Sequence, residues 1–125
     1  MSRTKVRSSL LEARYTATGT ITNTTGATPV DWAAAAVYKM NAALTGNIEF
    51  DFTNYVAGQV LTIYNISGSH TITLDSDASS SESFLKAGSD YDGSTTNILQ
   101  IECLAGGNDA IFVYSVSTYA SDATP

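Results

Sequence analysis

Apolar and polar side chains alternate without a break from Ile48 to Thr53, and this pattern constrains the fold more than any other part of the chain. Successive side chains of a strand point to opposite faces, so the alternation predicts a strand with one buried face and one wet face. Similar short runs, separated by Gly, Asn, Asp and Ser, recur along the chain and predict about eight strands. They fall at residues 15–22, 36–44, 48–53, 60–66, 70–74, 84–85, 97–104 and 109–116.

The composition favours the same class of fold. Charged residues make up 14% of the 125 residues, and Thr, Ser, Asn and Gly fill many polar positions instead. Thr prefers strands, while Asn and Gly prefer tight turns. We therefore expect an all-β, single-domain antiparallel β-sandwich or jelly roll of about eight strands with an N-terminal arm. Within it, a turn at 67–69 is expected to close a hairpin between the strands at 60–66 and 70–74.

Charge is distributed unevenly along the chain, whose net charge is −6. Residues 1–14 hold four basic side chains against one acid, a net charge of +3, whereas residues 15–125 hold two lysines against eleven acids, a net charge of −9. The sequence thus divides into a basic arm at 1–14, a β-sandwich domain at 15–118 and a C-terminal tail at 119–125. The acidic body should repel nucleic acid and anionic membranes. The arm suits an acidic surface, such as that of a neighbouring copy, or is a solvated terminus. Its basic residues are Arg3, Lys5, Arg7 and Arg14.

Residues 28–36 fit two kinds of secondary structure. Thr28, Pro29 and Asp31 resemble the start of a helix, and apolar residues follow at helical spacing. The even positions from 30 onward also form an alternating apolar face, as a strand would. Because alanine fits both patterns, periodicity does not decide between them. We favour a strand from about Ala36, after a short turn or helical bend.

No residue pattern marks a catalytic centre, and we expect the protein not to be an enzyme. His70 is the single histidine and follows a turn, with no second histidine in the chain to act with it. Cys103, the single cysteine, is in phase with the apolar residues of its strand, which predicts a buried thiol. Asp-x-Asp pairs at 75–77 and 90–92 offer carboxylates that suit Ca²⁺, but their spacing is not that of an EF-hand. Solvated loops are the favoured interpretation, and we expect no cofactor and no metal.

Three tyrosines fall outside the expected strands. Tyr55, Tyr91 and Tyr119 lie in loops or in the tail. Tyrosine is enriched at interfaces, where it offers both a ring and a hydroxyl. With the basic residues of the arm, these tyrosines are the candidate contact residues of the chain.

Several segments in the middle of the chain follow one another in a recognisable order. An Asp-Trp pair at 31–32 precedes Leu-Thr-Gly-Asn and a strand at 44–52. Ala-Gly-Gln-Val-Leu-Thr-Ile at 57–63 and Gly-Ser-His-Thr-Ile-Thr-Leu at 68–74 come next. In this order of turns and strands, residues 30–116 resemble β-sandwich domains of tailed-bacteriophage structural proteins, which occur in tail fibres and in small capsid-associated proteins. No catalytic or ligand-binding motif accompanies the resemblance.

The resemblance implies a structural protein of the virion. The first hypothesis is a capsid decoration, or cement, protein that docks on the assembled shell and stabilises it. Its partners would be the major capsid protein and further copies of itself, as a homotrimer on the capsid surface. The alternative is a host-surface-binding module of a head or tail fibre, which would touch glycan through loops 75–81 and 88–96. A sugar-binding or hydrolytic protein is a third class and would need paired carboxylates facing a cleft.

The sequence also indicates where such a protein would be assembled. No apolar segment follows the basic N-terminus, so we expect no secretion signal. No apolar stretch is long enough to span a bilayer. We therefore expect assembly in the host cytoplasm, without a membrane or nucleic-acid partner.

Overall fold

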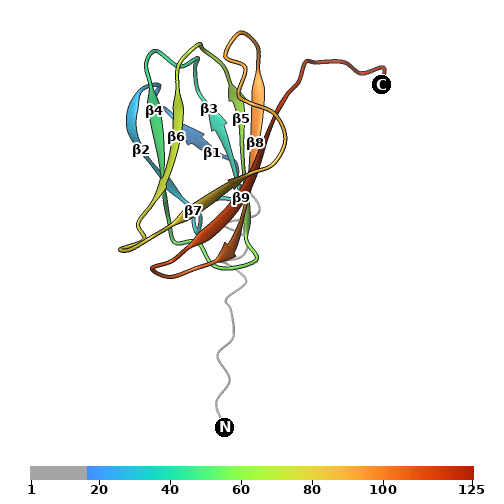
Figure 1. Cartoon of the computed structure of the whole chain (residues 1–125). Coiled ribbons are helices and arrows are strands. Elements are labelled where there is room, and N and C mark those ends of the chain that lie inside the picture. Colours follow the sequence, from blue (N-terminus) through green and yellow to red (C-terminus); the bar gives the residue numbers. More distant parts are fainter. Residues whose placement is uncertain (1–16) are drawn as a thin grey trace.

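The computed structural model describes residues 17–125, and these form nine strands and no helix (Figure 1). The whole of the proposed arm at 1–14, with its basic residues, lies outside the described residues. The strands are β1 (Gly19–Ile21), β2 (Gly26–Asp31), β3 (Val37–Met40), β4 (Ile48–Thr53), β5 (Val60–Ile66), β6 (Ile72–Ser76), β7 (Ser83–Lys86), β8 (Asn97–Ala105) and β9 (Ile111–Thr118).

The first six strands wind around a common core as a short β-solenoid of three coils. β1, β3 and β5 lie side by side in one sheet, β2, β4 and β6 in a second sheet, and every neighbouring pair among them is parallel. Each coil contributes one strand to each sheet (Figure 1). β8 and β9 then extend the first sheet by antiparallel pairing, and β7 joins β9 at its edge. A six-stranded sheet of order β1-β3-β5-β8-β9-β7 thus packs against a three-stranded sheet of order β2-β4-β6.

The all-β prediction is confirmed for residues 17–125, but the antiparallel arrangement is wrong for most strand pairs. Of the seven pairs among the described strands, five are parallel, and β5–β8 and β8–β9 are antiparallel. The expected hairpin at 60–74 is also wrong, because β5 and β6 belong to different sheets. Gly68, with a φ of 105°, lies in the turn that carries the chain from one sheet to the other. Alternation identifies a strand and its buried face, but it does not identify the strand's partner.

The ambiguous segment at 28–36 contains a strand followed by a turn. β2 ends at Asp31, and a turn leads into β3 at Val37, so the preference for a strand after a short turn is confirmed. The carboxylate Oδ1 of Asp31 accepts hydrogen bonds from the Ala33 backbone N–H and from Nδ2 of Asn54, both at 2.9 Å. These two hydrogen bonds hold the turn that follows β2.

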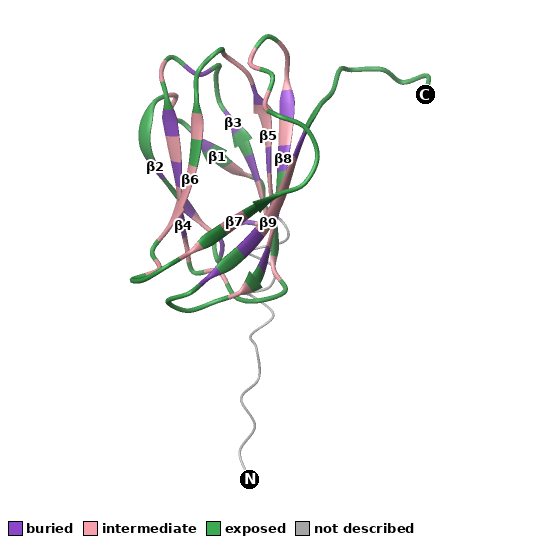
Figure 2. Cartoon of the chain, in the orientation of Figure 1, coloured by how far each residue is buried: buried purple, intermediate pink, exposed green. Residues whose placement is uncertain are grey.

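Buried residues from both sheets form a single core. Figure 2 marks the buried positions along the strands in purple. Buried residues alternate with half-buried ones along β4, and with half-buried or exposed ones along β8, as the sequence pattern requires. Trp32 is fully buried, with its ring centroid 5.6 Å from that of Phe52 and 5.7 Å from that of Phe112. Cys103 is also fully buried, as predicted, and burial raises the pKa of its thiol. The largest fully buried side chains are Trp32, Phe50, Phe52, Phe112, Met40, Ile48, Leu61, Ile63, Ile66 and Ile101.

The two edges of the three-stranded sheet differ. Along β2, the backbone N–H groups of Gly26 and Trp32 donate toward the β4 side, to Asn47 and Thr53. The intervening Pro29 belongs to the residues whose backbone faces the free edge, and proline has no N–H to offer there. Proline on an edge strand hinders pairing with another strand. The opposite edge, along β6, has no such block.

Candidate functional site

The outer face of the three-stranded sheet carries a cluster of acids. Glu49 and Asp51 are the two acids on the outward face of β4, and Asp75 on β6 is the register partner of Asp51. One carboxylate oxygen from each of the three lies within 4.8 Å of the other two. Glu82, from the loop before β7, interacts with Asp75 and is hydrogen-bonded to Ser76. Parallel pairing of β4 and β6 therefore concentrates negative charge at one place.

Repulsion between carboxylates and desolvation together raise the pKa values of Glu49, Asp51 and Glu82. The Asp51 carboxylate raises the pKa of Glu49, with further contributions from desolvation and from Asp75. Desolvation and the charge of Asp75 raise the pKa of Asp51. Desolvation and a hydrogen bond with Asp75 raise the pKa of Glu82. In each case the folded chain holds the proton more tightly than an isolated carboxyl group would.

The cluster has the donor set of a hard cation. Carboxylate oxygens suit Ca²⁺ and Mg²⁺, and Glu49, Asp51 and Asp75 are the residues that could supply them. The atom Oδ1 of Asp51 is buried and has no hydrogen-bond partner among the described residues. A cationic side chain from another segment would satisfy the same oxygens as well as a metal would.

The outer face of the six-stranded sheet has the opposite chemistry. One row of register partners crosses the neighbouring strands β5, β8, β9 and β7. It consists of Val60, Glu102, Val113 and Leu85, and three of these four residues are aliphatic. Val60 and Leu85 are each 49% exposed. The neighbouring row holds uncharged polar residues. On this face the described strands carry two charged residues, at positions 39 and 102.

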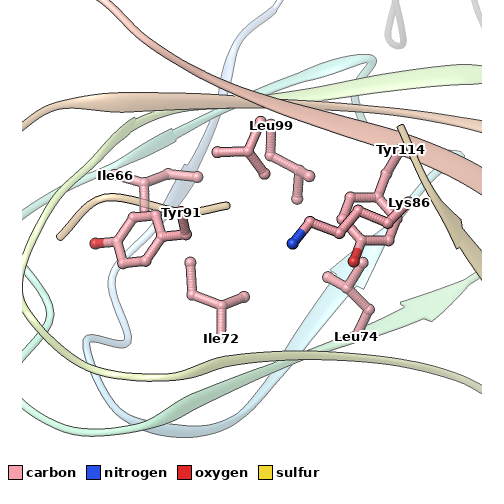
Figure 3. Close-up of a pocket in the computed structure, with 8 residues that line it drawn as sticks. Ile66, Ile72, Leu74, Lys86, Tyr91, Leu99 and Tyr114 are labelled. Carbon is pink, nitrogen blue, oxygen red and sulfur yellow. The ribbon is translucent and has the colours of Figure 1, made fainter. Parts of the chain in front are cut away.

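A third feature is an apolar cavity of about 130 Å³ between the two sheets (Figure 3). β6 is the edge strand of the three-stranded sheet, whereas the facing sheet continues beyond this point through β8, β9 and β7. The cavity opens at this edge. Lys86 points its ammonium group into it and forms an ion pair with Asp90 (Figure 3). The lining residues are Ile66, Ile72, Leu74, Lys86, Tyr91, Leu99, Tyr114 and Val116.

The three candidate tyrosines have separate roles within the fold. The ring of Tyr55 packs edge-on against that of Phe112, with centroids 4.9 Å apart. The hydroxyl of Tyr91 donates to a backbone carbonyl 2.8 Å away, and that of Tyr119 accepts from the backbone N–H of Asn65 at 3.0 Å. The structure does not gather them into one surface, and their contact with another molecule stays a prediction.

The two Asp-x-Asp pairs are not brought together either. Asp75 joins the acid cluster, while Asp77 lines a polar hollow beside Tyr55. Asp90 pairs with Lys86. Asp92 accepts hydrogen bonds from a neighbouring serine, which lower its pKa. Each pair is thus divided between different surroundings.

The sequence prediction missed the acid cluster for a specific reason. The alternation from Ile48 to Thr53 places Glu49 and Asp51 on one wet face, so that part of the signal was present. The position of Asp75 beside them results from the parallel register of β4 and β6. The expected antiparallel hairpin does not produce this register. Recognising repeated coils of similar length would have supplied the missing register.

No family model, curated protein or solved structure matches this chain. No helix among residues 17–125 is long and apolar enough to cross a membrane. The two outer faces and the cavity are therefore the features of the chain that bear on its function.

Proposed function

We propose that the protein is a structural module that works by contact rather than catalysis, and specifically a capsid decoration protein that docks as a homotrimer on an assembled phage shell. The observation that carries the proposal is the difference between the two outer faces. One presents the acids Glu49, Asp51 and Asp75, and the other presents the aliphatic row of Val60 and Leu85. Apolar area drives association, whereas buried charges are costly to desolvate. The six-stranded face is therefore the one that meets the shell.

Location and copy number test this proposal. Antibody labelling of virus particles from cells that produce the protein should decorate the whole head surface, in numbers comparable with the capsid protein. Particles stripped of the protein should lose resistance to heat, and adding it back should restore that resistance. Heads without label, or stripped particles that are as stable as complete ones, would exclude a decoration role.

A charge placed in the aliphatic row tests which face docks. Val113→Glu should weaken binding to stripped particles, because its carboxylate would be desolvated at the contact beside Glu102. Ala43→Glu adds the same charge in the exposed turn after β3 and should leave binding unchanged. Equal binding of both variants would show that another surface makes the contact.

A host-surface-binding module is the second candidate, and one observation favours it. A polar hollow of about 290 Å³ is lined by Asn54, Tyr55, Asp77, Ala78, Gly107 and Asn108. An aromatic ring beside amide and carboxylate groups is a combination that can bind a sugar, since the ring offers an apolar face and the polar groups hydrogen-bond hydroxyls. Label confined to tail or fibre tips, with glycan binding lost in Tyr55→Ala, would favour this function over decoration.

A further inference from the structure

The free edge of β6 is open to another strand. Ile48 donates its N–H to the carbonyl of Thr71, and Asp77 donates to that of Phe52, so the odd-numbered residues of β6 bond toward β4. The backbones of Ile72 and Leu74 consequently face away from β4. Among the described strands, none pairs with this edge. Unlike β2, the strand has no proline to block it.

The apolar cavity lies directly beside this edge. Ile72 and Leu74 are on β6, and both line the cavity with their side chains (Figure 3). A cavity of roughly 150 Å³ holds a benzene-sized group, so this one, at about 130 Å³, has room for an aliphatic side chain. A strand added to β6 would direct every second side chain toward it.

The opposite face of the same edge carries the acid cluster. Asp75 lies on β6 itself, with Asp51 and Glu49 on the next strand. Lys86 is near the edge, but it points into the cavity and is paired with Asp90. The site therefore fits an extended segment with cationic residues at alternate positions and an aliphatic residue between them.

The N-terminal sequence has this pattern. Arg3, Lys5 and Arg7 alternate with Thr4 and Val6. If the segment is extended, the three cations lie on one face and Val6 on the other.

We propose that residues 3–7 of the chain add to the free edge of β6 in the same molecule, as a fourth strand parallel to it. Arg3, Lys5 and Arg7 lie over the acid cluster, and Val6 enters the cavity beside Leu74. Main-chain hydrogen bonds hold the segment, and the cavity and the carboxylates select its sequence. The strand completes the three-stranded sheet and covers the opening between the sheets.

The point where the described chain begins favours the segment of the same molecule. Gly19, at the start of β1, is packed against the ring of Tyr38, whose hydroxyl donates to the carbonyl of Asp31 at 2.5 Å. The described part of the chain thus begins near the end of β2, and the parallel register places the ends of β4 and β6 on the same side. A position beyond β6 is three strand spacings from β2, about 14 Å. The nine residues at 8–16 span up to about 30 Å, and attachment keeps the segment at millimolar effective concentration.

Hydrogen exchange of the full chain tests the added strand. The amides of Ile72 and Leu74 should be protected in the wild type, and should exchange at least about tenfold faster in the combined variant Arg3→Gln, Lys5→Gln, Arg7→Gln. Arg14→Gln removes a charge outside the segment and should leave both amides protected. The central amide of Ile63 monitors folding and should not change. Edge amides that exchange freely in the wild type, or at equal rates in both variants, would overturn the proposal.

Cross-linking tests the orientation and which molecule supplies the strand. Val6→Cys combined with Leu74→Cys, or with Ile72→Cys, should form a disulfide in a species of monomer mass, because neighbouring strands place such pairs within bonding distance. Lys5→Cys combined with Leu74→Cys should not, because position 5 points to the opposite face. A cross-linked dimer, or no cross-link with either cavity partner, would overturn addition within one molecule.

Discussion

Asp51 and Asp75 are register partners on the parallel strands β4 and β6, so two carboxylates occupy adjacent outward positions. Oδ1 of Asp51 is buried there and has no hydrogen-bond partner within the described part of the chain. A fold that pairs like charges is destabilised at this place unless a cation covers them. The parallel register of the solenoid thus places two negative charges side by side on the outer face, and the basic N-terminal sequence is a source of cations that could offset them.

Asp75→Asn should stabilise a chain whose arm lacks its cations. In the background Arg3→Gln, Lys5→Gln, Arg7→Gln, the amide removes a charge beside Asp51 and can donate to a neighbouring carboxylate. The free energy of unfolding should rise by about 0.5 kcal/mol, as measured by urea denaturation. With the wild-type arm the gain should be smaller, since the proposed cations already offset the repulsion. Destabilisation in the Gln background would mean that Asp75 has a favourable partner there.

The pH dependence of stability follows from the raised pKa values of Glu49, Asp51 and Glu82. An acid whose pKa is higher in the folded chain binds more protons when folded, so protonation favours folding. In the same Gln background, the melting temperature should rise as the pH falls from 7 toward about 4, where unfolded carboxyl groups also begin to protonate.

Two other acids act in the opposite direction at lower pH. Hydrogen bonds lower the pKa of Asp92 and of Asp122, so their stabilising contribution is lost as the pH falls through the folded values, below about 4. Stability should therefore pass through a maximum at mildly acid pH, measurable as a melting temperature series. A steady fall from pH 7 downward would contradict the raised pKa values of the cluster.

Asn97→Asp should be strongly destabilising although it is nearly isosteric. Asn97 is fully buried, and its Nδ2 lies 3.2, 2.7 and 3.1 Å from the carbonyl oxygens of Ile66, Asp92 and Thr95. A carboxylate would face these acceptors without a donor, which should cost about 3 kcal/mol at neutral pH. Asn41→Asp, in an exposed turn, should change the unfolding free energy by less than about 0.5 kcal/mol. Similar midpoints for both variants in denaturant would refute the importance of this amide.

The sequence was informative about which residues form strands and which of them are buried. The alternation around Phe50 and Phe52, and the phase of Cys103, identified core positions correctly. Strand partners were not predictable in the same way, because side-chain alternation looks alike in parallel and antiparallel sheets of this kind. The same residue types occur in a short polar turn that closes a hairpin and in one that carries the chain to a second sheet, as the turn at Gly68 does.

The candidate site depended on that missing information. Glu49 and Asp51 were expected on a wet face, but their meeting with Asp75 requires the parallel register. The cavity arises because one sheet has three strands and the other six, which no local pattern encodes. Tyr55 was identified as a loop residue, yet it packs on Phe112, because a long aromatic side chain reaches the core from outside a strand.

Gly93→Ala and Gly106→Ala separate steric crowding from the general effect of replacing a glycine. A Cβ on Gly93 would lie 2.7 Å from the carbonyl carbon of Gly68 and 2.7 Å from Cα of Ser69, which are backbone atoms that cannot turn aside. A Cβ on Gly106 would meet no atom within 4 Å. Gly93→Ala should therefore lower the unfolding free energy by about 2 kcal/mol, whereas Gly106→Ala should be neutral or slightly stabilising.

Gly93→Ala would disturb the hydrogen bonds between the loop around Gly93 and the turn at Gly68. Gly93 accepts the backbone N–H of Gly68 at 2.9 Å, and Tyr91 donates to the Gly68 carbonyl, so the loop before β8 is bonded to the turn between β5 and β6. Separating the two should open the cavity that Tyr91 lines, and hydrogen exchange of the Gly68 amide should accelerate in Gly93→Ala and stay unchanged in Gly106→Ala. Equal denaturation midpoints for the two variants would show that the loop and the turn are not in close contact in solution.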